Sequence, residues 1–179
     1  MPKKTTTVPD PNAILINAER FLLAANHLTE ALSRTGNPGL STAFIVNGAL
    51  ALELYMKCIF VLDSKKPPLR THDLVRIYDA LCHEVRQHLN DSYRTVLNTN
   101  PAHRAMAIKI REMGIRNPQL EDPKIRTELE EVADAFVSWR YAWEGNLKGF
   151  AKFGELVRAM RATISYCDPS VKFEVPVFD

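Results

Sequence analysis

Apolar residues recur at three- and four-residue spacing through most of this chain, which is the pattern of amphipathic helices. Three of these stretches open with an acid or amide residue followed by proline: Asp10-Pro11, Asn100-Pro101 and Asp122-Pro123. That order is typical of an N-cap followed by the first residue of a helix. The pattern predicts helices over residues 11–33, 40–62, 71–90 (with a break before 93–97), 101–113, 123–143 and 152–166.

The segment 40–62 is apolar on nearly all sides, as expected for the central helix of a bundle. Glu53 and Lys57 interrupt it, one helical turn apart. Because other apolar helices are available to cover it, the pattern favours a buried helix over a membrane span. A proline-containing loop follows, and Thr71-His72-Asp73-Leu74 then predicts a new helix with Thr71 as its N-cap.

The C-terminal segment 168–179 alternates instead, with an apolar residue at every second position from Val171 to Val177. Pro176 confines such a segment to an edge strand or an extended arm, packed on its own bundle or on a neighbouring subunit. We therefore predict an all-α fold, an up-and-down helical bundle of five to six helices with an extended C-terminal tail. Residues 1–9 form a disordered arm, 10–167 the bundle and 168–179 the tail.

Composition places the chain among ordinary globular proteins. Its 179 residues suit one domain, with 46% hydrophobic and 25% charged residues. A net charge of +2 is too small to indicate nucleic-acid binding by itself. The three cysteines are far apart, with no zinc spacing, which favours reduced thiols filling the core of a cytoplasmic protein without a metal or cofactor: Cys58, Cys82 and Cys167. The N-terminus lacks the apolar stretch of a secretory signal.

Three features, read in order, resemble the HEPN family of small helical domains. Residues 51–54 with Lys57 resemble that family's apolar helix with a glutamate and a lysine one turn apart. Thr71-His72-Asp73-Leu74 resembles its next helix start, and Trp139-Arg140-Tyr141 with Glu144 resembles the Arg-Tyr pair of a late helix. The resemblance covers residues 14–166 and implies a helical fold, often dimeric, among RNA-cutting toxins and defence factors.

The sequence departs from that family where its ribonucleases place an arginine, a polar residue and, after four to six residues, a histidine. Residues 141–147, which follow Arg140, contain no histidine. Arg20 and Arg76 reach a histidine at that spacing, but an apolar residue follows each of them. We therefore predict a non-catalytic, homodimeric module that binds a nucleotide, RNA or a partner protein in a defence or toxin–antitoxin setting.

Two alternatives remain open. One is a divergent, metal-independent ribonuclease with a relocated site that uses His72, Arg140 and Glu53. The other is a purely structural homodimerisation domain. The candidate binding or polar site comprises seven residues: Glu53, Lys57, His72, Asp73, Arg140, Tyr141 and Glu144.

Each of these residues has a structural and a functional interpretation. Glu53 either forms a structural pair with Lys57 or Arg140, or orients those two cations to bind a phosphate. His72 either docks the helix start or handles a ligand or a proton. The aromatic residues around Arg140 pack in the bundle or at a dimer surface. The basic segments 103–116 and 148–161 are solvated helix faces or phosphate contacts, and the acidic block 121–134 could meet a basic patch of a second copy.

Overall fold

The computed structural model of the protein describes residues 7–114, 122–140 and 152–173, without the side chains of 134–140. Within these residues the fold is all-α, which confirms the predicted class, and it contains no strand. The helices are α1 (Pro11–Thr35), α2 (Gly39–Ser64), α3 (Leu74–Asp79), α4 (His83–Thr99), α5 (Pro101–Glu112), α7 (Ile125–Arg140) and α8 (Phe153–Cys167).

Two of the three predicted proline helix starts are correct. The Asp10 carboxylate accepts the Asn12 N–H at 3.0 Å, and the Asn100 amide oxygen accepts the Ala102 N–H at 3.0 Å, so both residues cap their helices. At the other end of α1, Gly36 adopts φ +64° and its N–H closes on the Leu32 carbonyl at 2.8 Å. At these three helix ends the signals in the sequence are thus local ones.

The predicted start at Thr71 is wrong. Thr71 uses its hydroxyl to accept the Asp73 N–H at 3.1 Å, and Asp73 is the N-cap, accepting the Arg76 N–H at 3.1 Å. The helix therefore begins at Leu74, three residues later than predicted.

The segment predicted as one helix over 71–90 is two helices, α3 and α4. Leu81 is buried between them, and the Asp63 carboxylate at the end of α2 accepts the Cys82 N–H at 2.7 Å. This tertiary contact turns the chain at residues 80–82, so the break lies there and not before Tyr93.

The start of α7 also differs from the prediction. The helix begins at Ile125, whose N–H donates to the Asn90 side-chain oxygen of α4 at 3.2 Å. The Asp122 carboxylate, expected as the N-cap, instead pairs with Arg94 of α4. Side chains of α4 therefore hold the first turn of α7, a role that the local sequence does not encode.

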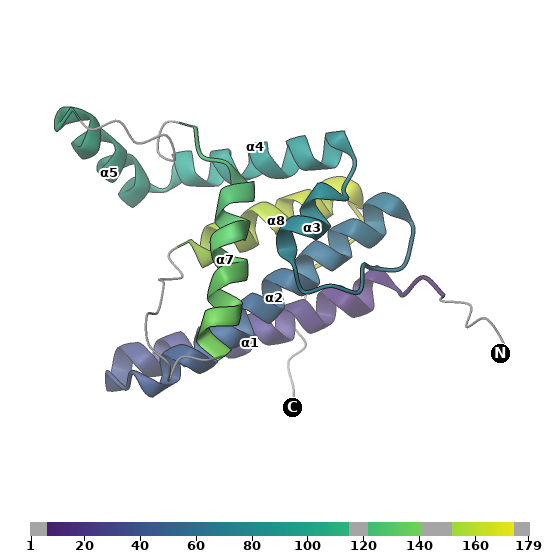
Figure 1. Ribbon diagram of the computed structural model, residues 1–179, viewed down its shortest axis with the longest axis horizontal. Helices are drawn as coiled ribbons and strands as arrows, with labels where there is room; N and C mark the ends of the chain where they lie inside the picture. Colours follow the sequence, from purple (N-terminus) through teal and green to yellow (C-terminus); the bar gives the residue numbers. More distant parts are fainter. Residues whose placement is uncertain (1–6, 115–121, 141–151, 174–179) are drawn as a thin grey trace.

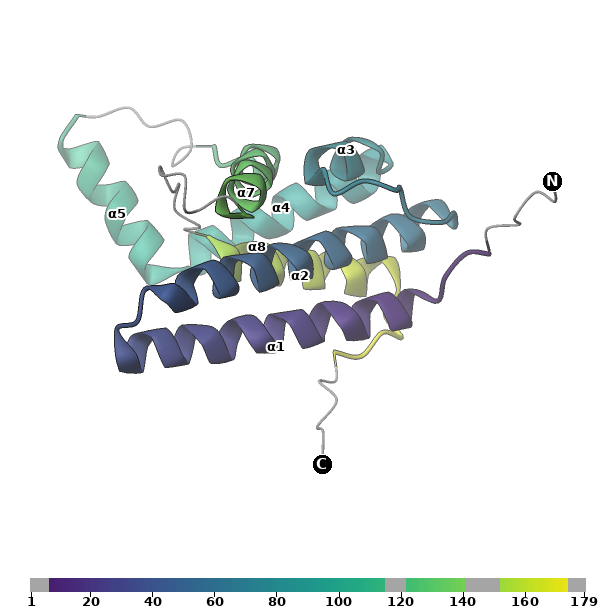
Figure 2. The same cartoon turned by 60° about the horizontal axis from the view of Figure 1, so that its bottom comes forward.

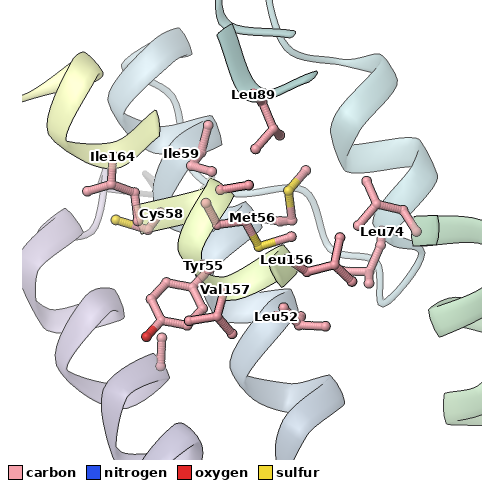
Figure 3. Close-up of a cluster of buried hydrophobic side chains, with 14 of the residues drawn as sticks. Leu52, Tyr55, Met56, Cys58, Ile59, Leu74, Leu89, Leu156, Val157 and Ile164 are labelled. Carbon is pink, nitrogen blue, oxygen red and sulfur yellow. The ribbon is translucent and has the colours of Figure 1, made fainter. Parts of the chain in front are cut away.

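α2 forms the centre of the molecule. It contacts α1, α3, α7 and α8, and α1 runs alongside it over much of its length (Figure 2). Leu52, Met56 and Ile59 meet side chains of α3, α4 and α8 in the core (Figure 3). α2 is long and apolar enough to cross a membrane, but 72% of its most apolar window is buried in the protein, as in the core helix of a soluble protein.

α5 stands apart from the packed helices of the bundle. α7 begins beside α4 and crosses α2 (Figure 1), whereas α5 projects outward from the end of α4. In the tail, residues 168–173 are irregular, and Val171 and Phe173 pack against the protein's own core. Residues 174–179, with the rest of the predicted alternation, and 1–6 of the predicted arm lie outside the described residues.

Candidate functional sites

Glu53 lies at the centre of the predicted polar site. Its Oε1 accepts a hydrogen bond from the Lys57 ammonium group at 2.6 Å, and its Oε2 lies 2.8 Å from His72 Nδ1. Because a carboxylate only accepts hydrogen bonds, Nδ1 carries the proton in this contact. The structure thus brings three of the seven predicted residues together and forms the predicted pair between Glu53 and Lys57.

Burial across this cluster is uneven. The Glu53 side chain is 8% exposed and that of Lys57 17%, whereas the His72 side chain is 74% exposed. Both Glu53 oxygens are engaged, so the cluster fastens the loop before α3 to the central helix. The exposed imidazole face is the part of the cluster that a ligand could reach.

The other predicted site residues divide into two groups. Asp73 caps α3, 20 residues after Glu53 along the chain, and its described contact is structural. The Arg140 side chain and residues Tyr141 and Glu144 lie outside the described residues. A ligand site that joins Lys57 to Arg140 therefore stays a prediction.

A second buried carboxylate, Glu19 of α1, was not singled out by the sequence analysis. Its Oε1 accepts the Tyr55 hydroxyl at 2.6 Å and the Arg161 Nε at 3.0 Å, while Arg161 Nη2 bonds to its Oε2. Glu19 is 1% exposed, and the Arg161 guanidinium carbon also lies 5.4 Å from the centre of the Phe173 ring. The contact ties α1, α2, α8 and the tail together.

One local signal could have indicated Glu19. It sits among Leu15, Ala18 and Leu22, which are buried residues at helical spacing on the same helix. A carboxylate on an apolar face needs a cationic or donor partner. The partners themselves lie 36 and 142 residues away in the sequence, so they could not be identified from spacing.

A third polar cluster lies where α4, α5, α7 and α8 approach one another. Lys152 pairs with Glu128, which is 5% exposed, and the Asn100 amide donates to Glu155 at 2.8 Å. Tyr93 is fully buried near Glu128, and its hydroxyl forms no hydrogen bond of ordinary geometry. Burial, followed by the neighbouring Glu128 carboxylate, raises the pKa of Tyr93.

His103 of α5 borders this third cluster. Its Nε2 is buried without a hydrogen-bond partner. Burial, and then the Lys152 ammonium, lower the pKa of His103, which favours the neutral imidazole at pH 7. The acid–base groups are suitable for proton transfer, but the atoms that lack partners are sealed from solvent, so we interpret the cluster as structural.

An open cleft of about 560 Å³ lies between α3, α4 and α7. The residues that line it all carry a polar group on the side chain: Tyr78, Asp79, His83, Arg86, Gln87, Asn90 and Arg126. None of these residues was a candidate in the sequence analysis. The signal that could have found them is the polar spacing of 83, 86, 87 and 90, which places four side chains on one face of α4.

The helix α5 has no buried residue, and α4 is the described helix that it contacts most. Three cations on it form no side-chain hydrogen bond or ion pair with any residue that the structure describes: Arg104, Lys109 and Arg111. Met106, Ile108 and Met113 are 57%, 57% and 63% exposed, three of the six exposed large hydrophobic residues of the described chain. α5 is thus a basic helix with uncovered apolar side chains.

The cysteines follow the predicted pattern only in part. Cys58 is buried, and burial raises the pKa of its thiol to about 12. Cys167 is partly buried, and burial raises its pKa to about 11. Cys82 is exposed at the start of α4, so its prediction as a core residue is wrong. Among the described residues, no group of three His, Cys, Asp or Glu side chains is placed to hold a metal ion.

Comparison of the chain with protein-family models, with curated proteins and with solved structures finds no match.

Proposed function

We propose that the protein is a non-catalytic RNA-binding module of the HEPN type, and that α5 is its RNA-contacting element. The observation that carries this proposal is the set of three unpaired cations on a projecting helix. The HEPN resemblance supplies the setting in defence or in a toxin–antitoxin pair, and the widely spaced cysteines favour a cytoplasmic location.

The charges of α5 are suited to a phosphate backbone. Arg104 and Arg111 are seven residues apart and therefore share one face of the helix, with Lys109 on another side. Within the helix only Glu112 offsets them. Since their side chains have no carboxylate partner to release, binding a phosphate would break no described ion pair.

The Glu53 cluster supports the non-catalytic part of the proposal. Catalysis by His72 would require its Nδ1 to leave Glu53 or its other ring nitrogen to act alone. The engaged Glu53 oxygens favour a fastening role.

The test is binding of a labelled single-stranded RNA, followed by fluorescence anisotropy at several salt concentrations. We expect the wild type to bind, and the triple variant Arg104→Gln/Lys109→Gln/Arg111→Gln to bind at least about tenfold more weakly. Three lost phosphate contacts should also reduce the steepness of log K against log salt by about 2.

The matched control removes three exposed cations elsewhere: Lys65→Gln/Lys66→Gln/Arg70→Gln in the loop between α2 and α3. Both triple variants lose the same net charge. An equal loss of affinity in the two variants, or no RNA binding by the wild type, would contradict the proposal. Gel analysis of the RNA after incubation tests the ribonuclease alternative, since cleavage that His72→Ala abolishes would support that alternative.

The apolar side chains of α5 favour a second candidate function, homodimerisation through this helix. The occupant would be a second copy, because the exposed face of α7 carries the opposite charge at Glu130 and Glu131. Light scattering should then show a dimer that Met106→Ser/Ile108→Ser dissociates. Ile16→Ser, which changes an exposed apolar residue of α1, is the control. A monomeric wild type would eliminate this candidate.

A further inference from the structure

The open cleft between α3, α4 and α7 has a wall made by one polar face of α4. His83, Arg86, Gln87 and Asn90 lie at positions i, i+3, i+4 and i+7 of that helix, so their side chains project in the same direction. α4 packs its apolar face into the core, and the face that lines the cleft is its solvated side, on which His83 and Gln87 are exposed. The half-buried members of that face, Arg86 and Asn90, are therefore the ones that need an explanation.

Arg86 is the cation of that face without a counterion. It is half-buried, and among the described residues its guanidinium has neither a hydrogen bond nor an ion pair. The Tyr78 hydroxyl lies close enough to feel its charge: burial raises the pKa of Tyr78, and the Arg86 guanidinium opposes that rise. At pH 7 the cleft thus holds a phenolic O–H donor beside an unpaired guanidinium.

The opposite wall is already neutralised and fixed in place. Arg126 donates two hydrogen bonds to Asp79, Nε to Oδ1 at 3.2 Å and Nη2 to Oδ2 at 3.1 Å. Arg126 also pairs with Glu130. The Asn90 side-chain oxygen is engaged by the Ile125 N–H. The lining acid Asp79 is therefore committed to Arg126, and Arg86 remains as the positive group that a ligand would meet.

We propose that this cleft binds the phosphate group of a small phosphomonoester such as a mononucleotide, with Arg86 as the principal cation. A guanidinium presents paired donors that match phosphate oxygens. Tyr78, His83 and Gln87 add further donors around it. The volume of the cleft lies within the range of small-molecule sites. This proposal is independent of RNA binding by α5, because it concerns a different surface and different residues.

The test is isothermal titration of the full chain with AMP, inorganic phosphate and adenosine. We expect AMP and inorganic phosphate to bind and adenosine not to bind. A tighter Kd for AMP than for phosphate would identify a mononucleotide as the ligand, and equal values would identify the phosphate group alone. Arg86→Gln should weaken AMP binding by about tenfold, the effect of one lost charge-assisted contact.

Two controls keep this experiment specific. Arg34→Gln removes an exposed cation at the end of α1 and should leave the Kd for AMP unchanged, as should the triple α5 variant. Unchanged melting temperatures would show that Arg86→Gln remains folded. Binding of neither AMP nor phosphate at millimolar concentration would overturn the proposal. So would equal AMP affinities of Arg86→Gln and the wild type.

Discussion

Two buried carboxylates, Glu53 and Glu19, differ in where their partners lie along the chain. Glu53 belongs to α2, and its partners are Lys57, four residues away, and the exposed His72. Glu19 belongs to α1, and its partners come from α2 and α8. Both carboxylates are buried, at 6% and 1% exposure for the whole residues. The first contact is mainly local, whereas the second joins helices that are distant in the sequence.

This difference should determine how much each cluster contributes to stability. Lys57 can extend into solvent if it loses Glu53, because its side chain reaches the surface. Glu19 has no such route, since it is almost fully enclosed and depends on donors from other helices. The cost of breaking each cluster is thus the cost of leaving its carboxylate without partners.

The largest expected effect is from Arg161→Met, which keeps the aliphatic volume but removes both donors to Glu19. We expect the free energy of unfolding to fall by about 3–5 kcal/mol, the cost of an uncompensated buried charge. Urea unfolding followed by circular dichroism measures it. Arg158→Met on the same helix is the control, because the Arg158 side chain is 57% exposed and its contact with Glu155 should contribute less than about 1 kcal/mol. Similar losses in both variants would contradict the argument.

The next effect tests the hydroxyl of Tyr55. Tyr55→Phe removes one hydrogen bond to a buried carboxylate and should cost about 2 kcal/mol in the same urea experiment. Tyr93→Phe is a close control, because Tyr93 is equally buried but its hydroxyl forms no hydrogen bond of ordinary geometry with a described residue. That variant should lose little stability or gain some. A greater loss for Tyr93→Phe than for Tyr55→Phe would reverse this assignment.

The same contrast explains what could be predicted from the sequence. The apolar run of α2 indicated the central helix, and Asp10 and Asn100 indicated two helix starts, because these signals lie within a few residues of their effect. Asn90 holds the start of α7, and Asp63 helps to set the break before α4, across 35 and 19 residues. No local pattern specifies such pairs.

The candidate sites follow this rule as well. The pair between Glu53 and Lys57 follows from helical spacing, and the structure contains it. The Glu19 cluster was missed because tertiary packing decides which polar residues lose their contact with water and which donors they then meet. The spacing of residues 83, 86, 87 and 90 could have indicated one polar face of α4, but only the packing of α3 and α7 beside it makes that face the wall of a cleft.

A smaller effect is expected at Glu53. Glu53→Gln should lower the free energy of unfolding by about 1 kcal/mol, since Lys57 and His72 both reach solvent. The comparison with Glu19→Gln is the informative one. That variant leaves Arg161 without its charged partner and should be the less stable of the two. If Glu53→Gln lowers the free energy of unfolding more than Glu19→Gln does, the local cluster contributes more to stability than the Glu19 cluster.

The smallest effect concerns pH and the third cluster, which is also built from remote residues. Burial and the Lys152 ammonium place the pKa of His103 below its ordinary value of 6.5, so the unfolded chain takes up a proton first as the pH falls. The stability associated with neutral His103 is present above pH 6.5 and is lost as the pH falls through the folded-state pKa.

His103→Gln lacks this titration, so the free energy of unfolding of this variant should fall less than that of the wild type between neutral and acidic pH. The difference between the two should be less than about 1 kcal/mol. Urea unfolding at a series of pH values measures the difference, and His27→Gln, which changes an exposed histidine of α1, should keep the wild-type profile. A steeper acid loss in His103→Gln would mean that the Glu128 and Glu155 carboxylates outweigh burial and Lys152 at this position.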